Sequence, residues 1–455
     1  MIFIYTCKAR LNAALQVYDM LWNVEGKKYI VYGDSIEEEY RLTDTCLVLN
    51  VGDYYEHLSE KTKKMFQVAE KLFPGESILK MDDDILPNSA MIQEHLDQLK
   101  EIQYAGRCCT SEEHESVHHV GKVKDTAYDI PMVVPATNST AGPMYYLGPQ
   151  AIHALNQSPH SFFYEDVTVG YCLNHAGFEP KDTVLYHDED TNSTYHNHSN
   201  HKKLYVKLHG GLGNQLFQVA SGYGIAKKHQ CILIVVSDYR TSSFPHQEKV
   251  DSYLKTIFKP FRVIHQDHLP SIPHYLEIDN VQCFQYNESI DTENTLFIEG
   301  YLQTEKYFKD YRTEILSLFK PYDLRLDSYF IHIRRGDYVN IPLHYIPYED
   351  YYKKAIDFIE SRSPNSHYYI VSDDISYCKG CGLFDALQKT FVEDTAMNTL
   401  SIMSSCKGGV CSNSTFSWWG SYLIDNPEKI VIFPKTWIHN GHDNLDIYYE
   451  GSIIL

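Results

Sequence analysis

The chain has 455 residues, 43% of them hydrophobic and 22% charged, which predicts two or three globular units and excludes an intrinsically disordered chain. Its 60 acidic and 40 basic side chains give a net charge of −20. Such a charge disfavours nucleic acid and anionic membrane surfaces as main partners.

The first third of the chain alternates short apolar runs with amphipathic stretches. Strands are predicted at 1–6, 28–32, 45–50 and 77–81, and helices at 10–22 and 59–73. This order is typical of an open, mostly parallel α/β sheet, where ligands gather at the carboxyl ends of the strands. Asp82, Asp83 and Asp84 directly follow the strand 77–81, so we expect them at that edge.

Residues 187–203 are polar and rich in Asn, Ser and His, which indicates a domain boundary. The α/β pattern then restarts, with strands predicted at 203–208, 329–335, 367–372 and 429–433, the last strand of the chain, and with helices at 215–229, 348–361, 396–406 and 415–425. We therefore expect domains at 1–190 and 203–455, joined by a linker at 191–202.

Four motifs in the second half suit a nucleotide diphosphate. They read HGGLGNQLFQ at 209–218, HIRRGDY at 332–338, SDD at 372–374 and CSNSTFSWWG at 411–420. Adjacent arginines at a strand end offer forked donors, and a glycine-rich turn brings backbone N–H groups to a helix start. Each motif alone is typical of an ordinary turn, a solvated pair or a helix cap; the combination favours a binding site.

With FIEGYLQTEKYF at 297–308, these motifs closely resemble the α1,2-fucosyltransferase family over residues 203–455. The resemblance implies a GT-B-like pair of Rossmann lobes and inverting transfer from GDP-fucose without a cofactor. It implies that Arg334 is catalytic and holds the diphosphate together with Arg335. The other GDP-fucose-binding residues that it implies are His332, Asp337, Asp373, Ser414, Thr415, Gly211, Gly213 and Asn214. The candidates for the catalytic base are His209, Glu299 and Asp337.

Carboxylates crowded at a strand end favour a divalent cation, so the Asp82–Asp84 triplet predicts a metal site, with a solvated acidic loop as the alternative. With GPMYYLGPQ at 142–150 and EDVTVGYCL at 165–173, residues 1–190 resemble the β1,3-galactosyltransferase and β1,3-N-acetylglucosaminyltransferase family. The resemblance implies a GT-A-like fold, Mn²⁺ and UDP-galactose or a related UDP-sugar. It implies UDP-sugar binding by Asp82, Asp83 and Asp84, metal binding by Asp82, Asp84 and His187, and catalysis by Asp166. The alternatives are a helix-start carboxylate for Asp166 and a linker residue for His187.

The 11 cysteines form no dense framework, which favours reduced thiols, and the pair Cys378 and Cys381 indicates a loop and not a zinc site. No apolar stretch has the roughly 18 residues that a membrane span needs. We expect a soluble, cytoplasmic protein.

The leading hypothesis is a bifunctional glycosyltransferase that acts on a glycan or glycoprotein acceptor. Its first half adds a hexose, taken as β1,3-linked galactose, and its second half then adds α1,2-linked fucose. One alternative is a fucosyltransferase whose first half is an inactive glycan-binding domain. The other is a carbohydrate-binding protein without enzymatic activity.

Overall fold

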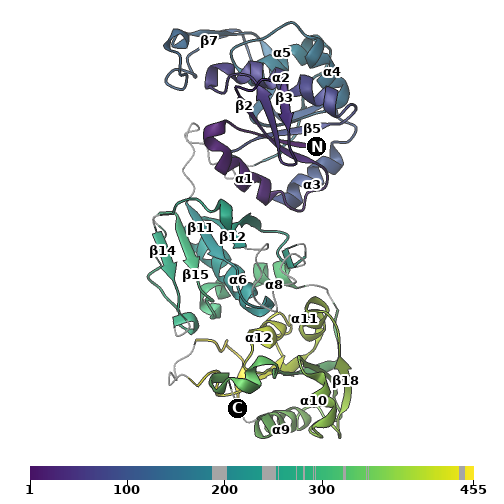
Figure 1. Ribbon diagram of the computed structural model, residues 1–455. Coiled ribbons are helices and arrows are strands. Elements are labelled where there is room, and N and C mark those ends of the chain that lie inside the picture. The colour runs from purple at the N-terminus through teal and green to yellow at the C-terminus, as the bar shows by residue number, and fades with distance from the viewer. Residues whose placement is uncertain are drawn as a thin grey trace. The chain divides into compact units, whose positions relative to one another are not determined.

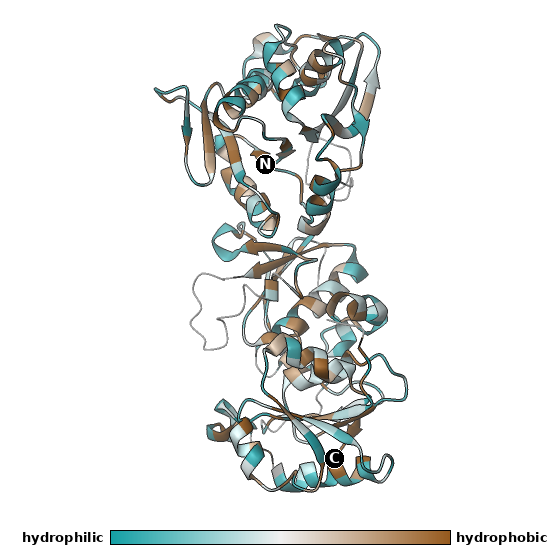
Figure 2. Cartoon of the chain, turned by 90° about the vertical axis from the view of Figure 1, so that its right-hand side faces the viewer, coloured by the Kyte–Doolittle hydropathy of each residue, from teal (hydrophilic) through white to brown (hydrophobic). Residues whose placement is uncertain are grey.

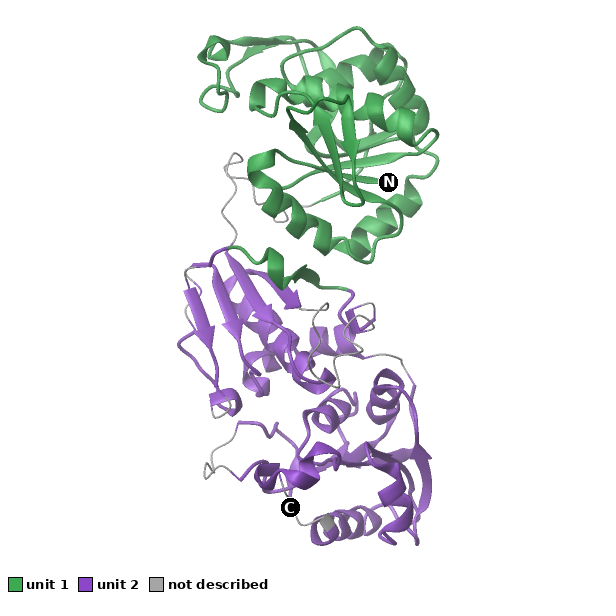
Figure 3. Ribbon diagram, in the orientation of Figure 1, with its two compact units in different colours: residues 1–201, 260–270 green, residues 202–259, 271–455 purple. Residues whose placement is uncertain are grey.

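The computed structural model describes residues 1–186, 202–237, 253–254, 256–272, 274–279, 282–290, 292, 294–320, 324–344, 346, 348–439 and 446–455. The chain forms two compact units (Figure 3), residues 1–201 with 260–270 and residues 202–259 with 271–455. His187 and all of the predicted linker except Lys202 lie outside the described residues.

An eight-stranded sheet forms the centre of the first unit (Figure 1), in the order β10-β6-β9-β5-β1-β2-β4-β3. Its strands are β1 (Ile2–Tyr5), β2 (Lys28–Asp34), β3 (Tyr40–Leu42), β4 (Cys46–Asn50), β5 (Ile78–Asp82), β6 (Tyr104–Ser111), β9 (Thr137–Leu147) and β10 (Lys181–Asp182). The four predicted strands β1, β2, β4 and β5 pair in parallel. The strand β9 runs antiparallel to both β5 and β6, so the sheet is mixed on that side.

Helices cover both faces of this sheet, which explains the unbroken apolar run of β1. Phe3 and Tyr5 point to the face covered by α2 (Leu58–Leu72), α4 (Pro149–Gln157) and α5 (Glu165–His175). Ile2 and Ile4 point to the face covered by α1 (Leu11–Met20) and α3 (Ser89–Gln98). A separate hairpin, β7 (His114–Ser116) with β8 (Met132–Val134), follows β6.

The second unit contains two parallel sheets. Four strands of this unit lie in the order β12-β11-β15-β14, formed by β11 (Lys203–Lys207), β12 (Ile232–Ser237), β14 (His274–Glu277) and β15 (Leu296–Glu299). The other sheet has six strands in the order β18-β17-β16-β19-β20-β21, formed by β16 (Ser328–Ile333), β17 (His367–Ser372), β18 (Gln388–Val392), β19 (Gly408–Val410), β20 (Ile430–Phe433) and β21 (Ile453–Ile454). The segment Pro260–Pro270, with β13 (Arg262–His265), groups with the first unit.

The helices of the second unit are α6 (Leu212–His229), α8 (Arg312–Phe319), α9 (Tyr348–Glu360), α10 (Ile375–Gly380), α11 (Ala396–Ser405) and α12 (Thr415–Tyr422). Figure 2 shows hydrophobic residues along the strands and hydrophilic residues on the outer sides of the helices. Trp418 and Trp419 of α12 are both fully buried.

Several predicted boundaries in this unit are wrong. The helix predicted at 215–229 begins at Leu212, the helix predicted at 415–425 ends at Tyr422, the strand predicted at 329–335 ends at Ile333, and β21 follows the strand predicted to be last. The glycine-rich turn is shorter than its composition suggests, whereas the arginine pair lies beyond the end of the strand that was predicted to include it.

All 11 cysteines are free thiols. Within the described part of the chain, no helix combines the length and the apolar character needed to cross a membrane.

Candidate active sites

In the first unit, the three adjacent aspartates at the end of β5 lie in three different environments. Asp82, the last residue of the strand, pairs with Lys80 Nζ at 2.6 Å. The buried Asp83 pairs with Arg10 at 2.8 Å and accepts a hydrogen bond from the hydroxyl of Thr6. The Oδ1 atom of Asp84 is buried without a partner. Asp83 is therefore a structural carboxylate, whereas Asp84 retains an unused acceptor.

The helix α5 brings two further carboxylates to this edge. Glu165 and Asp166 are its first residues, and both lie against Gly142 of β9. A Cβ on Gly142 would approach Glu165 Oε2 to 3.3 Å and Asp166 Cβ to 3.7 Å, so the absence of a side chain creates this room. Burial, with the charge of Glu165, raises the pKa of Asp166 to about 6. A carboxylate of this kind is ionised at neutral pH and is more basic than an ordinary aspartate.

The donor set at the end of β5 fits a divalent cation bound together with a phosphate. Burial raises the pKa of Asp82, and the charges of Asp84 and Glu165 act in the same direction, against Lys80. A cation relieves this repulsion and uses the unpartnered oxygen of Asp84. Among the described residues, no group of three His, Cys, Asp or Glu side chains could hold a metal. Oxygen atoms of a nucleotide and of water are further ligands that a divalent cation accepts.

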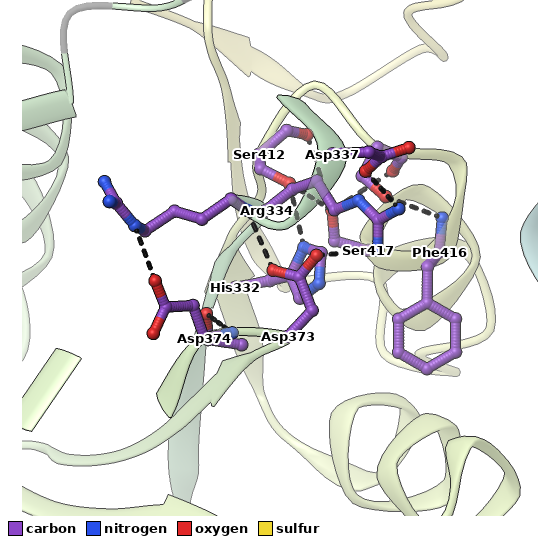
Figure 4. A network of polar contacts seen from close by, with 11 residues as sticks. His332, Arg334, Asp337, Asp373, Asp374, Ser412, Phe416 and Ser417 are labelled. Atoms are coloured by element: carbon purple, nitrogen blue, oxygen red, sulfur yellow. Dashed lines mark hydrogen bonds and ion pairs between the residues drawn. The ribbon is translucent and has the colours of Figure 1, made fainter. Parts of the chain in front are cut away.

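In the second unit, the arginine pair follows β16 directly, and its two side chains bind different carboxylates (Figure 4). The guanidinium of Arg334 bridges Asp337 at 2.7 Å and Asp373 at 2.9 Å. Arg335 pairs with Asp374 at 3.1 Å, and its guanidinium lies 3.4 Å from the ring centroid of Tyr377. Arg334 is thus the arginine whose guanidinium binds two carboxylates at the end of β16. The side chain of Arg335 lies instead against the start of α10.

Gly336 and His332 explain how this arginine is held. The Oδ1 atom of Asp373 accepts from the backbone N–H of Arg335, and a Cβ on Gly336 would come within 2.4 Å of Asp373 Oδ2. His332 is buried, and its Nδ1 lies 2.8 Å from Ser412 Oγ. Burial, with the charge of Arg334, lowers the pKa of His332 to about 3, so its ring is neutral. It can orient its neighbours and carries no charge of its own.

The glycine-rich turn and the helix start at Ser414 lie against each other. Thr415 donates to Asn214 Oδ1 at 2.8 Å, and the same oxygen accepts from Gln303 at 2.9 Å. A Cβ on Gly213 would lie 2.5 Å from the backbone of Thr415, so glycine permits the close approach of α6 and α12. Gly213, Asn214 and Thr415 therefore make contacts between these helices, and their role as nucleotide ligands stays a prediction.

The two remaining predicted ligands occupy helix starts. Ser414 is the N-cap of α12 and accepts from the N–H of Phe416 at 3.4 Å. Gly211 is the N-cap of α6, and a Cβ there would meet nothing within 4 Å. Gly211 therefore has open space beside it, where the backbone of a helix start can approach a ligand.

The candidate bases are all engaged with neighbours. Glu299 pairs with Lys207 at 2.7 Å, and Asp337 pairs with Arg334. The amide of Gln218 accepts from the backbone N–H of His209 and donates to Gly300 O, which turns its NH₂ group toward His209 Nδ1 at 2.9 Å. This arrangement favours the neutral tautomer with its proton on Nε2, which makes His209 a donor at that atom.

Some functional contacts could not be found from sequence patterns. Lys80 lies inside an apolar strand, and nothing in the sequence indicated that Tyr145 donates to Glu165 Oε1, at 2.6 Å. Arg10 ends a short 3₁₀ segment after β1 and gave no motif. The spacing of Lys80 and Asp82, two positions apart on one strand, was the available signal, because it places both side chains on one face.

Comparisons with known proteins agree with the division into two halves. A model described as Glycosyl transferase family 11 matches residues 183–450, and a model described as Galactosyltransferase matches residues 27–184. An alpha-1,2-colitosyltransferase of Escherichia coli is 28% identical over 273 residues, which are 52% of this chain and 93% of the relative. A galactoside 2-alpha-L-fucosyltransferase of Caenorhabditis elegans is 26% identical over 298 residues, which are 54% of this chain and 79% of the relative.

Among solved structures, the fucosyltransferase NodZ from Bradyrhizobium is similar over 49% of this chain and 92% of its own. The identity is 14% and the TM-score is 0.33. This likeness is too low to support a statement about the function of the chain.

Proposed function

The chain belongs to glycosyl transferase family 11, and we propose that its second unit transfers fucose from GDP-fucose to O2 of a galactose residue. The observation that carries this proposal is the guanidinium of Arg334, held at the end of β16 by two carboxylates. The C. elegans relative, whose name describes this reaction, supports the choice of donor and linkage. The two parallel sheets of the unit suit a GT-B-like pair of lobes.

In the proposed reaction, the acceptor hydroxyl passes its proton to one of the candidate bases, its oxygen attacks C1 of fucose, the bond from C1 to the diphosphate oxygen breaks, and GDP leaves with the bonding electron pair and increased negative charge. Arg334 neutralises that charge, because its planar fork can donate to two phosphate oxygens. Its partner Asp337 is half exposed, so this ion pair is weak and a diphosphate can replace it. Asp373 then keeps the guanidinium oriented.

For the first unit, the match to the Galactosyltransferase model supports galactosyl transfer. The β1,3 linkage, UDP-galactose as donor and the GT-A-like fold are part of the proposal. Asp166 would take the proton from the acceptor hydroxyl as this oxygen attacks C1 of galactose and UDP leaves. Its raised pKa and its place beside Gly142 suit the role of a general base.

Asp82 and Asp84 would hold Mn²⁺, which supplies positive charge to the diphosphate when it is bound. Asp83 keeps its pairing with Arg10 and Thr6, so its side chain shapes the turn, and its part in binding the UDP-sugar stays a prediction. His187 lies outside the described residues, and its part in metal binding stays a prediction.

The two reactions have a chemical order, because galactose added by the first site is a suitable acceptor for the second. One chain that carries both sites raises the local concentration of the intermediate. We therefore expect galactosylated acceptor to form before the fucosylated product.

A second donor deserves a direct test, because the E. coli relative is named as a colitosyltransferase. Colitose is fucose without the hydroxyl at C3, so a site that uses both donors makes no strong contact with that hydroxyl. The same experiment tests the alternative in which the first unit only binds glycans.

The test is a donor screen on the full chain with UDP-galactose, UDP-N-acetylglucosamine, GDP-fucose and GDP-colitose, read by released nucleotide and by mass of the acceptor. A β-galactoside serves as acceptor for the GDP-sugars, and a β-N-acetylglucosaminide for the UDP-sugars. We expect turnover with GDP-fucose and UDP-galactose. No turnover with either GDP-sugar would contradict the proposal for the second unit.

A further inference from the structure

Lys80 is a fully buried charged residue of the first unit that the proposed reaction does not use. It lies on β5 and is 1% exposed. Its ammonium reaches Asp82 Oδ1 at 2.6 Å, the carbonyl oxygen of Gly142 at 2.6 Å and Glu165 Oε1 at 3.4 Å. A lysine has three N–H donors, so these three contacts account for all of them.

The three partners of Lys80 come from three different elements. Asp82 ends β5, Gly142 belongs to β9, and Glu165 begins α5. Glu165 is fixed further by the hydroxyl of Tyr145 at 2.6 Å. The ammonium is therefore the point at which the two strands and the start of the helix are joined.

Two short routes lead from this ammonium to Asp166. One passes through Glu165, the residue before it in α5. The other passes through Gly142, whose Cα faces Asp166, because a Cβ built there would lie 3.7 Å from Asp166 Cβ. Movement of either partner would move the proposed base relative to Asp82.

We propose that Lys80 is a positioning residue, which fixes the start of α5, and with it Asp166, relative to Asp82. The proposal rests on the function proposed for the first unit, where Asp82 holds the donor side and Asp166 acts on the acceptor. Lys80 touches neither substrate in this account and acts only through Asp82, Gly142 and Glu165.

Lys61 provides a matched control. It is also 1% exposed, its ammonium donates to Asp53 at 2.9 Å and to Thr6 O at 2.8 Å, and it lies over the ring of Tyr5 at 4.4 Å. Lys80 lies over the same ring at 4.8 Å. The two lysines have similar burial and pairing, but Asp53, Thr6 and Tyr5, which Lys61 contacts, all lie outside α5.

The test compares Lys80→Met and Lys61→Met in the full chain with two readouts. The first is hydrogen exchange of the peptide 162–172, which covers the start of α5. We expect exchange there to become at least about tenfold faster in Lys80→Met and to stay unchanged in Lys61→Met. The second is turnover of UDP-galactose with MnCl₂, where kcat should fall at least about tenfold in Lys80→Met while KM for UDP-galactose changes less than about threefold.

Unchanged exchange at 162–172, or a parental kcat in a folded Lys80→Met protein, would overturn the proposal. If Lys80→Met does not fold, the double variant Lys80→Met with Glu165→Gln removes both charges and takes its place. Exchange at 162–172 in the double variant should again be at least about tenfold faster than in the parent chain; parental exchange there in a folded double variant would overturn the proposal. If the parent protein does not turn over UDP-galactose, the proposed function of the first unit fails, and the exchange measurement alone decides whether Lys80 fixes α5.

Discussion

Thr415 donates a hydrogen bond of 2.8 Å to Asn214, although 201 positions of the chain separate the two residues. Asn214 lies in the first turn of α6, and Thr415 is the first residue of α12. The bond therefore joins two helix starts that the sequence predicted to bind GDP-fucose. It places those helix starts side by side, while the side chains of both residues are used for the contact itself.

Removal of this bond tests whether Thr415 only joins the starts of α6 and α12 or also binds GDP-fucose. Thr415→Val keeps the shape of the side chain and removes one hydrogen bond, worth about 1 kcal/mol, so kcat/KM for GDP-fucose should fall by about tenfold or less. Thr415→Ser keeps the hydroxyl and serves as the control. A fall of more than about 100-fold would show that Thr415 binds the nucleotide directly, as the sequence predicted.

The two reactions should differ in their need for metal. The diphosphate of a UDP-sugar meets the carboxylates of Asp82 and Asp84, and this repulsion requires a cation. The diphosphate of GDP-fucose meets the guanidinium of Arg334. EDTA should therefore abolish release of UDP, MnCl₂ should restore it, and release of GDP should be unaffected in the same sample. Equal loss of both activities would be inconsistent with this division.

The pH dependence of the first reaction should follow Asp166. Burial raises the pKa of this carboxyl to about 6, above its usual range, and a general base must be deprotonated to act. The value of kcat/KM for UDP-galactose should therefore fall about tenfold per pH unit below pH 6 and level off above it. A profile that stays flat between pH 5 and 8 would remove Asp166 from this role.

His332 should make the second unit sensitive to acid. Its native pKa of about 3 lies below the usual 6.5, because burial and Arg334 disfavour the charged ring. Between pH 3 and pH 6.5, the unfolded chain binds a proton at His332 and the folded chain does not. The contribution of His332 to the free energy of unfolding is therefore complete above pH 6.5. It is lost as the pH falls toward 3, at up to about 1.4 kcal/mol per pH unit.

The variant His332→Asn should reduce this loss of stability, measured by urea unfolding with tryptophan fluorescence. Trp418, Trp419 and Trp437 lie in the second unit, so three of the four tryptophans report on it. The same pH dependence in the variant and the parent would assign the acid sensitivity to other groups.

Much of the fold could be predicted because buried parallel strands are continuous apolar runs. The strand β17 has the predicted bounds, and β1, β5 and β20 differ from prediction by one or two residues at an end. The strand β9 was missed because its amino-terminal part is polar and contains Gly142 and Pro143, and only pairing with β5 and β6 makes it a strand. Its pairing depends on contacts far along the chain.

The candidate sites could be predicted where a motif places several chemical groups together, as in the segment from His332 to Asp337. The different partners of Arg334 and Arg335 could not, because they depend on which carboxylates of the turn 373–374 each side chain reaches. The positioning role proposed for Lys80 could not be predicted either, because it also depends on contacts between elements that are far apart in the sequence. The spacing of Lys80 and Asp82 on one strand indicates one partner, but the partners on β9 and α5 cannot be identified until those elements are placed beside the lysine.

The central claim is that one chain carries two independent glycosyl transfer sites, and it is tested most directly by two variants measured with both donors. Arg334→Lys keeps the charge but loses the planar fork, so fucosyl transfer from GDP-fucose should fall about 10²–10³-fold while UDP-galactose turnover stays at the parental rate. Asp166→Asn should give the reverse pattern. Loss of both activities in either variant, or fucosyl transfer by Arg334→Lys within about threefold of the parent, would contradict the account.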